Sequence, residues 1–158
     1  MTPLVPAMLP PPRAAQERAG ENPIRVLVVD DSAVVRGLLS RLIAEQPDLV
    51  VAATAANGQM ALNALAERSV DVAVLDIEMP VMDGLTALPR LLAADPYLRV
   101  IIASTLSTPG AAVTMRALAA GAADYVAKPS ASREITQAGS ANSDFRRDLV
   151  TKIRSLGE

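Results

Sequence analysis

Residues 71–84 read DVAVLDIEMPVMDG, and this stretch decides the fold. Its apolar run, Val72 to Leu75, has no polar alternation, which is typical of a strand buried on both faces of a parallel sheet. The run ends in a carboxylate, Asp76, and a loop that contains proline and glycine follows. In open parallel sheets, ligands bind beyond the carboxyl ends of the strands. Asp76 is therefore the first candidate for a functional residue.

The same alternation of apolar strand, polar turn and amphipathic helix repeats on both sides of this stretch. Ser32 can cap a helix that carries apolar rows starting at Val34 and Val35, and the last helix should bury Phe145, Leu149, Ile153 and Leu156. Five strands alternating with five helices predict an α/β fold, a doubly wound parallel sheet with helices on both faces. The expected strands are residues 24–30, 49–54, 71–76, 99–104 and 123–127.

Pro89 lies inside the helix that should follow Gly84. An interior proline costs about 3 kcal/mol because it removes a hydrogen bond and clashes with the preceding turn. The sequence therefore predicts either a kink at this position or a distorted first turn with regular helix only from Pro89.

The chain divides into a leader and one domain. Residues 1–23 hold six of the twelve prolines and show no helical or strand period, so we expect a disordered leader. Residues 24–158 are expected to form the domain, with a polar spacer at 130–143 and a final helix at 144–157.

Composition excludes several classes of function. The net charge of -2 and only three aromatic residues argue against a nucleic-acid-binding surface. The absence of cysteine and histidine excludes disulfides, a Ser-His-Asp triad and His-ligated zinc within this chain. No apolar stretch approaches the ~18 residues needed to span a bilayer, so a cytoplasmic location is expected by elimination.

Right-handed crossovers place the carboxyl ends of all the strands at one edge of the sheet. Polar residues from four strand ends should meet there: Asp30, Asp31, Asp76, Ser104 and Lys128. Converging carboxylates repel one another, and Mg²⁺, which prefers oxygen ligands, would relieve that repulsion. We expect direct ligation by Asp31 and Asp76, a water-mediated contact from Asp30, and a further ligand in the backbone carbonyl of Glu78.

A carboxylate can also act as a nucleophile and form an aspartyl phosphate, and Asp76 is central among the strands. Lys128 and Ser104 could then contact phosphoryl oxygens. Lysine is rare here, with two residues against thirteen arginines, so its presence at a strand end suggests a need for a compact charge. Each residue alone has an ordinary explanation as a cap, a turn residue or a solvated charge, but a common edge favours a joint function.

Four segments resemble the receiver domain of two-component response regulators: VLVVDDS at 26–32, LDIEMPVMDG at 75–84, the serine that ends VIIAS, and DYVAKP at 124–129. Glu78, STLST, GAADYVAKPS and the last helix are similar to the N-terminal receiver of chemotaxis protein-glutamate methylesterases of the CheB type. The resemblance covers residues 24–158. It implies a flavodoxin-like strand order, 2-1-3-4-5.

The resemblance also implies the roles of individual residues. Asp76 would be the phosphoacceptor for a phosphohistidine of a sensor kinase, with Asp30 and Asp31 as Mg²⁺ acids. Ser104, Tyr125 and Lys128 would sense the phosphoryl group and switch the surface. Without the resemblance, Tyr125 is equally well explained as a half-buried strand tyrosine.

The output implied by the resemblance is a methylesterase effector domain, in cis or in trans. From the charge, the few aromatic residues and the short apolar stretches we expect no nucleic acid or membrane partner. Since this chain lacks the esterase serine, histidine and aspartate, we expect it not to be an enzyme itself. An alternative is a stand-alone receiver that docks another partner or acts as a phosphate sink. A phosphatase resembling haloacid dehalogenases is disfavoured because Glu78 stands where those enzymes need a second aspartate.

Overall fold

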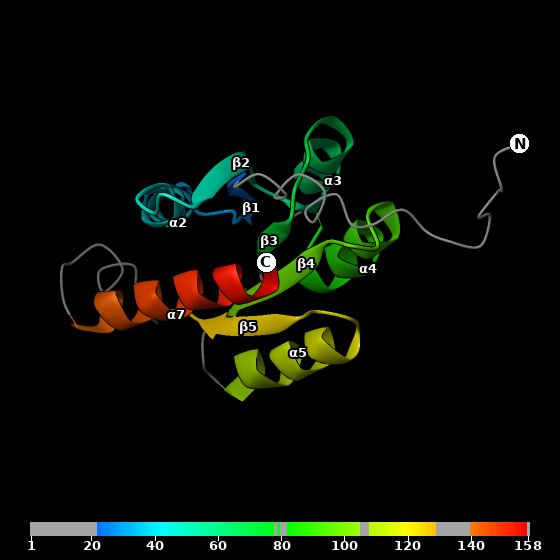
Figure 1. The fold of residues 1–158 in the computed structure, drawn as a ribbon. Helices are drawn as coiled ribbons and strands as arrows, with labels where there is room; N and C mark the ends of the chain where they lie inside the picture. Colours follow the sequence, from blue (N-terminus) through cyan, green and yellow to red (C-terminus); the bar gives the residue numbers. More distant parts are fainter. Residues whose placement is uncertain (1–21, 78, 80–81, 105–107, 129–139, 158) are drawn as a thin grey trace, which may run out of the picture.

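The computed structural model describes residues 22–77, 79, 82–104, 108–128 and 140–157, and Figure 1 shows one sheet with helices on both sides. The five strands run parallel in the order β2-β1-β3-β4-β5. This confirms the predicted doubly wound α/β fold and the strand order. The strands are β1 Ile24–Val29, β2 Leu49–Ala55, β3 Val72–Asp76, β4 Arg99–Ser104 and β5 Asp124–Ala127.

In the described part of the chain, five helices pack on the two faces of the sheet (Figure 1), and alternate residues of each central strand contribute to one core or the other. Val72 and Val74 of β3 lie in the core under α2 and α7, whereas Ala73 and Leu75 lie in the core under α3, α4 and α5. The central strand is thus buried on both faces, as predicted. The helices are α2 Ala33–Ala44, α3 Gly58–Glu67, α4 Gly84–Ala94, α5 Thr108–Ala119 and α7 Ser140–Gly157.

Side-chain caps fix the starts of three helices close to the carboxyl edge of the sheet. Ser32 accepts a hydrogen bond from the Val35 amide at 3.3 Å, and Asn57 and Asp83 cap α3 and α4 in the same way. In α2 the row that begins at Val35 is buried, whereas Val34 is 56% exposed, so only part of the apolar pattern predicted for this helix faces the core.

Helix α4 is continuous from Gly84 through Pro89, so the expectation that regular helix begins only at Pro89 is wrong. Asp83 accepts from the Thr86 amide at 2.8 Å and caps the first turn. Ala87, Leu88 and Leu91 are fully buried, and their packing offsets the hydrogen bond lost at the proline.

Helix α7 begins at Ser140, four residues before the start expected at 144, and the spacer residues 130–139 and the leader residues 1–21 lie outside the described part of the chain. This first turn was not predicted because residues 140–143 carry no apolar helical period. Serine and asparagine disfavour a helix only weakly, so the helix can still form there. Phe145, Leu149 and Ile153 are buried as predicted, and Leu156 is partly buried.

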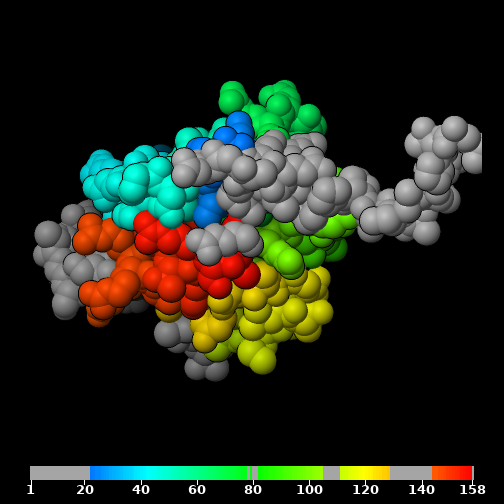
Figure 2. Space-filling model, viewed as in Figure 1, coloured from blue at the N-terminus to red at the C-terminus, as the bar shows by residue number. Residues whose placement is uncertain are grey.

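Arg154 clamps α7 to the loop before β2, and Figure 2 shows α7 lying against α2 at the surface. Its guanidinium donates to both carboxylate oxygens of Asp48, at 2.7 and 2.9 Å, and to Gln46 at 2.9 Å. These hydrogen bonds lower the pKa of Asp48 from its ordinary value of 3.8, although burial acts in the opposite direction. Within the described residues, no helix has both the length and the apolar character to cross a membrane.

Asp48→Asn should reduce the free energy of unfolding at neutral pH by about 0.5–1 kcal/mol, because the ion pair is bidentate but partly exposed. A carboxylate whose pKa is lowered by folding stabilises the fold above its ordinary pKa, and this contribution disappears as the pH falls through the folded value. Urea denaturation from pH 7 to pH 3 should therefore show the difference between the two proteins shrinking below about pH 4.

Asp144→Asn is the matched control, because Asp144 is exposed and lies 3.9 Å from Arg147. We expect no measurable change in stability from it. A loss equal to that of Asp48→Asn would show that the clamp has no special role.

Candidate functional site

Three carboxylates converge at the carboxyl edge of the sheet. Asp30 directly follows β1, Asp31 comes next, and Asp76 is the last residue of β3. One oxygen from each carboxylate lies within 4.8 Å of the other two. Asp30 and Asp76 are buried and Asp31 is exposed, so the cluster has a buried floor and a side open to solvent.

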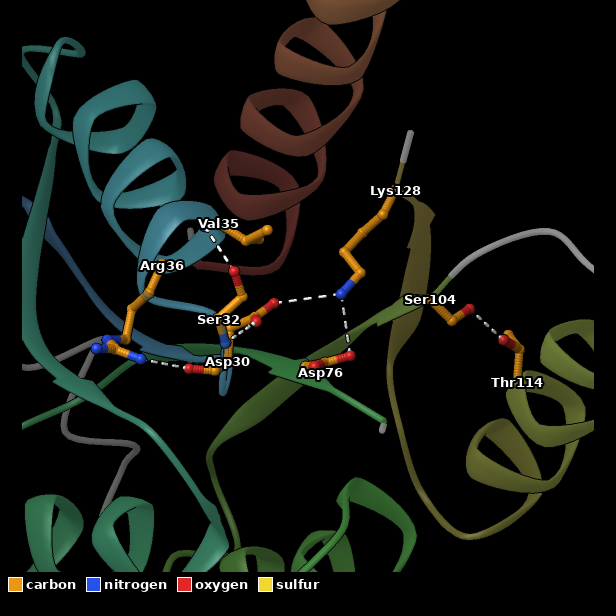
Figure 3. A network of polar contacts seen from close by, with 8 residues as sticks. All are labelled: Asp30, Ser32, Val35, Arg36, Asp76, Ser104, Thr114 and Lys128. Carbon is orange, nitrogen blue, oxygen red and sulfur yellow. Dashed lines mark hydrogen bonds and ion pairs between the residues drawn. The ribbon is translucent and has the colours of Figure 1, made fainter. Parts of the chain in front are cut away.

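Lys128, which directly follows β5, lies between two of these acids. Its Nζ is 3.2 Å from Oδ2 of Asp30 and 3.1 Å from Oδ1 of Asp76. Figure 3 shows the ammonium directed at both carboxylates. Burial, the largest influence, lowers the pKa of Lys128, but the two carboxylates together outweigh it and leave the pKa raised above 10.5. The ammonium is therefore charged throughout the physiological pH range.

Local contacts fix the position of Asp30. Its Oδ1 accepts from the Ser32 amide at 2.9 Å, which leaves Oδ2 directed at Lys128. The guanidinium of Arg36 donates to the backbone carbonyl of Asp30 at 2.7 Å. Sequence reasoning missed Arg36; its place on the first turns of the helix after the acid pair was the available signal.

Gly84 lies directly against the backbone of the acceptor candidate. Its amide donates to the Ile77 carbonyl at 2.8 Å. A Cβ at this position would lie 2.6 Å from the backbone oxygen of Asp76 and 2.7 Å from Cα of Ile77. Only glycine fits between these backbone atoms, which explains the DG pair that ends the decisive stretch.

Two other predicted residues lie apart from the cluster of acids and lysine. Ser104 Oγ is 2.6 Å from Thr114 Oγ1, and Figure 3 shows this hydroxyl pointing toward Thr114 rather than toward Asp76. Tyr125 is 40% exposed, with the Lys152 ammonium 4.8 Å from its ring centroid. Glu78, whose carbonyl was expected to complete a metal site, lies outside the described residues.

The donor set suits a hard divalent cation. With formal charges, three carboxylates and one ammonium leave 3 − 1 = 2 negative charges at the edge of the sheet. Oxygen ligands with one solvent-facing member match the preference of Mg²⁺ for few carboxylates and several retained waters. Asp30, Asp31 and Asp76 could therefore hold Mg²⁺ and leave coordination positions for another ligand.

Comparison with known proteins gives consistent matches. Residues 26–139 match the family model described as the response regulator receiver domain. A protein-glutamate methylesterase/protein-glutamine glutaminase of Rhodospirillum centenum is 54% identical over 138 residues, which are 87% of this chain and 34% of that protein. The chain thus spans about a third of the length of the curated relatives it matches.

Solved structures extend the comparison. The response regulator domain of Thermotoga maritima CheB is 39% identical, with a TM-score of 0.75 and coverage of 86% of this chain and 97% of that one. A chain in the crystal structure of the P1 domain of CheA3 with CheY6 from R. sphaeroides is 35% identical, with a TM-score of 0.67 and coverage of 85% and 97%.

Gly84→Ala should lower the free energy of unfolding by about 1–3 kcal/mol, because the new methyl group meets backbone atoms that cannot rotate away. Gly37→Ala on α2 is the matched control, since nothing lies within 4 Å of the added carbon. That change should raise stability by about 0.5–1 kcal/mol by favouring the helix. Urea denaturation measures both effects, and a shift of the two variants in the same direction would contradict the steric role of Gly84.

Proposed function

The chain belongs to the response regulator receiver domain family and resembles the receivers of CheB-type chemotaxis proteins, and from that premise we propose that Asp76 accepts a phosphoryl group from a sensor kinase. The observation that carries the proposal is the position of Lys128 Nζ, within 3.2 Å of both Asp30 and Asp76. A phosphoryl group on Asp76 would lie beside a fixed positive charge.

The proposed reaction is a transfer between a histidine and an aspartate. A carboxylate oxygen of Asp76 attacks phosphorus, an O–P bond forms, and the N–P bond of the phosphohistidine breaks, while the imidazole takes up a proton. The product is an acyl phosphate. Phosphoryl transfer depends chiefly on position and on neutralisation of charge, and the partly buried ammonium of Lys128 provides part of both.

Asp31 and Asp76 would hold Mg²⁺ directly, with Asp30 acting through water and the Glu78 carbonyl as a further ligand. When bound, Mg²⁺ supplies positive charge to the oxygens of the transferred group. The hydrogen bonds to Asp30 from Ser32 and to its carbonyl from Arg36 keep this acid in place before any ligand arrives.

The partners follow from the relatives and are part of the proposal. The R. sphaeroides complex pairs a similar chain with the P1 domain of CheA3, which supports a chemotaxis kinase as the donor. The curated relatives are methylesterases about three times as long, which supports a methylesterase domain, in cis or in trans, as the regulated output. We place the reaction in the cytoplasm. Ser104 and Tyr125 would report the phosphoryl group to the surface.

Incubation with acetyl phosphate and Mg²⁺ should add one phosphoryl group to the wild-type chain, and Asp76→Asn should abolish the addition because the nucleophile is lost. Intact-mass spectrometry measures the adduct. Asp83→Asn is the control, since asparagine also caps a helix and Asp83 lies outside the acid cluster. An adduct that survives Asp76→Asn would refute the assignment.

Asp31→Asn should weaken Mg²⁺ binding by about tenfold or more, since the loss of even an indirect ligand partner costs that much. The exposure of Asp31 means that the fold should tolerate the change. Calorimetric titration with Mg²⁺ would measure the effect, with Asp144→Asn as an exposed control outside the acid cluster. Equal affinities in the two variants would exclude Asp31 as a ligand.

A further inference from the structure

We propose that Thr114 is a positioning residue, one that holds the Ser104 hydroxyl on the α5 side of the sheet until a phosphoryl group on Asp76 draws it away. The inference rests on the proposed function of Asp76. Its basis is the 2.6 Å contact between Ser104 Oγ and Thr114 Oγ1, two hydroxyls that are both buried.

Strand geometry places the side chains of Asp76 and Ser104 on opposite faces of the sheet. Asp76 is paired in register with Ala103, which lies in the core under α2 and α7. Val100 and Ile102 lie in the core under α3, α4 and α5. Because side chains alternate along a strand, Ser104 shares the face of Ile102, where α5 presents Thr114.

The Ser104 side chain must therefore leave Thr114 to reach a group on Asp76. Either hydroxyl of this pair can be the donor, and in both cases the contact is lost when the Ser104 side chain turns to the face on which Asp76 lies. Hydrogen bonds to an anionic oxygen are stronger than those between two neutral hydroxyls, so a phosphoryl oxygen outcompetes Thr114. The net free energy gained by the new hydrogen bond is therefore smaller by the free energy of the hydrogen bond to Thr114 that is broken.

The exchange also reaches two other elements. The Ser104 carbonyl accepts from the Lys128 amide at 2.8 Å, so the backbone of Ser104 is joined to the residue that contacts Asp76. Its side chain is joined to α5 through Thr114. Release of Thr114 thus removes a polar contact between the sheet and α5 at the moment of phosphorylation.

The probe for the test is beryllofluoride, a mimic of the phosphoryl group, in the presence of Mg²⁺. Thr114→Val keeps the shape but removes the hydroxyl, so the Ser104 hydroxyl loses its partner and binding should tighten about three- to tenfold, the range that one net hydrogen bond contributes. Thr114→Ser keeps the hydroxyl and should bind like wild type. Calorimetry measures all three affinities.

Ser104→Ala, alone and combined with Thr114→Val, completes a double-mutant cycle. In that background Thr114→Val should leave beryllofluoride affinity unchanged, since there is no hydroxyl left to release. Urea unfolding without ligand gives a second readout. Because each single change leaves one buried hydroxyl without this partner, the double variant should lose less stability than the sum of the two single losses.

The outcomes separate this inference from the function on which it rests. Unchanged affinity in Thr114→Val, or an effect that persists with Ser104→Ala, overturns the role of Thr114 alone. A Thr114→Ser variant that departs from wild type as far as Thr114→Val does shows that the methyl group matters rather than the hydroxyl. Failure of the wild-type chain to bind beryllofluoride overturns the proposed function together with the inference.

Discussion

The ion pairs of Lys128 with Asp30 and Asp76 are the interaction on which this edge of the protein depends. They connect the ends of three strands, β1, β3 and β5, that are far apart in sequence. Two buried carboxylates side by side would repel each other strongly without the ammonium, and the partly buried ammonium would lose its compensating charges without them. These ion pairs therefore fix the positions of the three side chains more than they stabilise the fold. They also place the positive charge of Lys128 where a phosphoryl group on Asp76 would lie.

The two faces of the sheet have different tasks. Helices α2 and α7 cover the face on which Asp76 lies, and α7 is fastened by the Arg154 clamp as well as by its apolar side chains. On the other face, α5 meets the sheet through a polar contact at Ser104 and an apolar surface. A polar contact can be exchanged for another when a charge appears nearby, whereas close-packed apolar side chains resist such exchange.

Much of this could be read from the sequence because strand topology is a strong constraint. Asp30, Asp31, Asp76 and Lys128 were predictable as a group, since parallel strands direct their ends to one edge. Contacts that depend on tertiary packing could not be predicted from the sequence. The buried face of α4 outweighs Pro89, and the close approach of Gly84 to the backbone of Asp76 depends on how the loop folds back. The partnership of Ser104 with Thr114 depends on which face a strand end presents, and the start of α7 at Ser140 lacks any apolar signal.

The fit of Gly84 against the acceptor has a consequence for protein engineering. Asp76, Ile77 and Gly84 are joined by backbone contacts: the Gly84 amide donates to the Ile77 carbonyl, and a Cβ at position 84 would meet the backbone of Asp76 and Ile77. Grafting the aspartate onto another scaffold would fail without the glycine and its spacing, so the transplantable module is the whole segment 76–84.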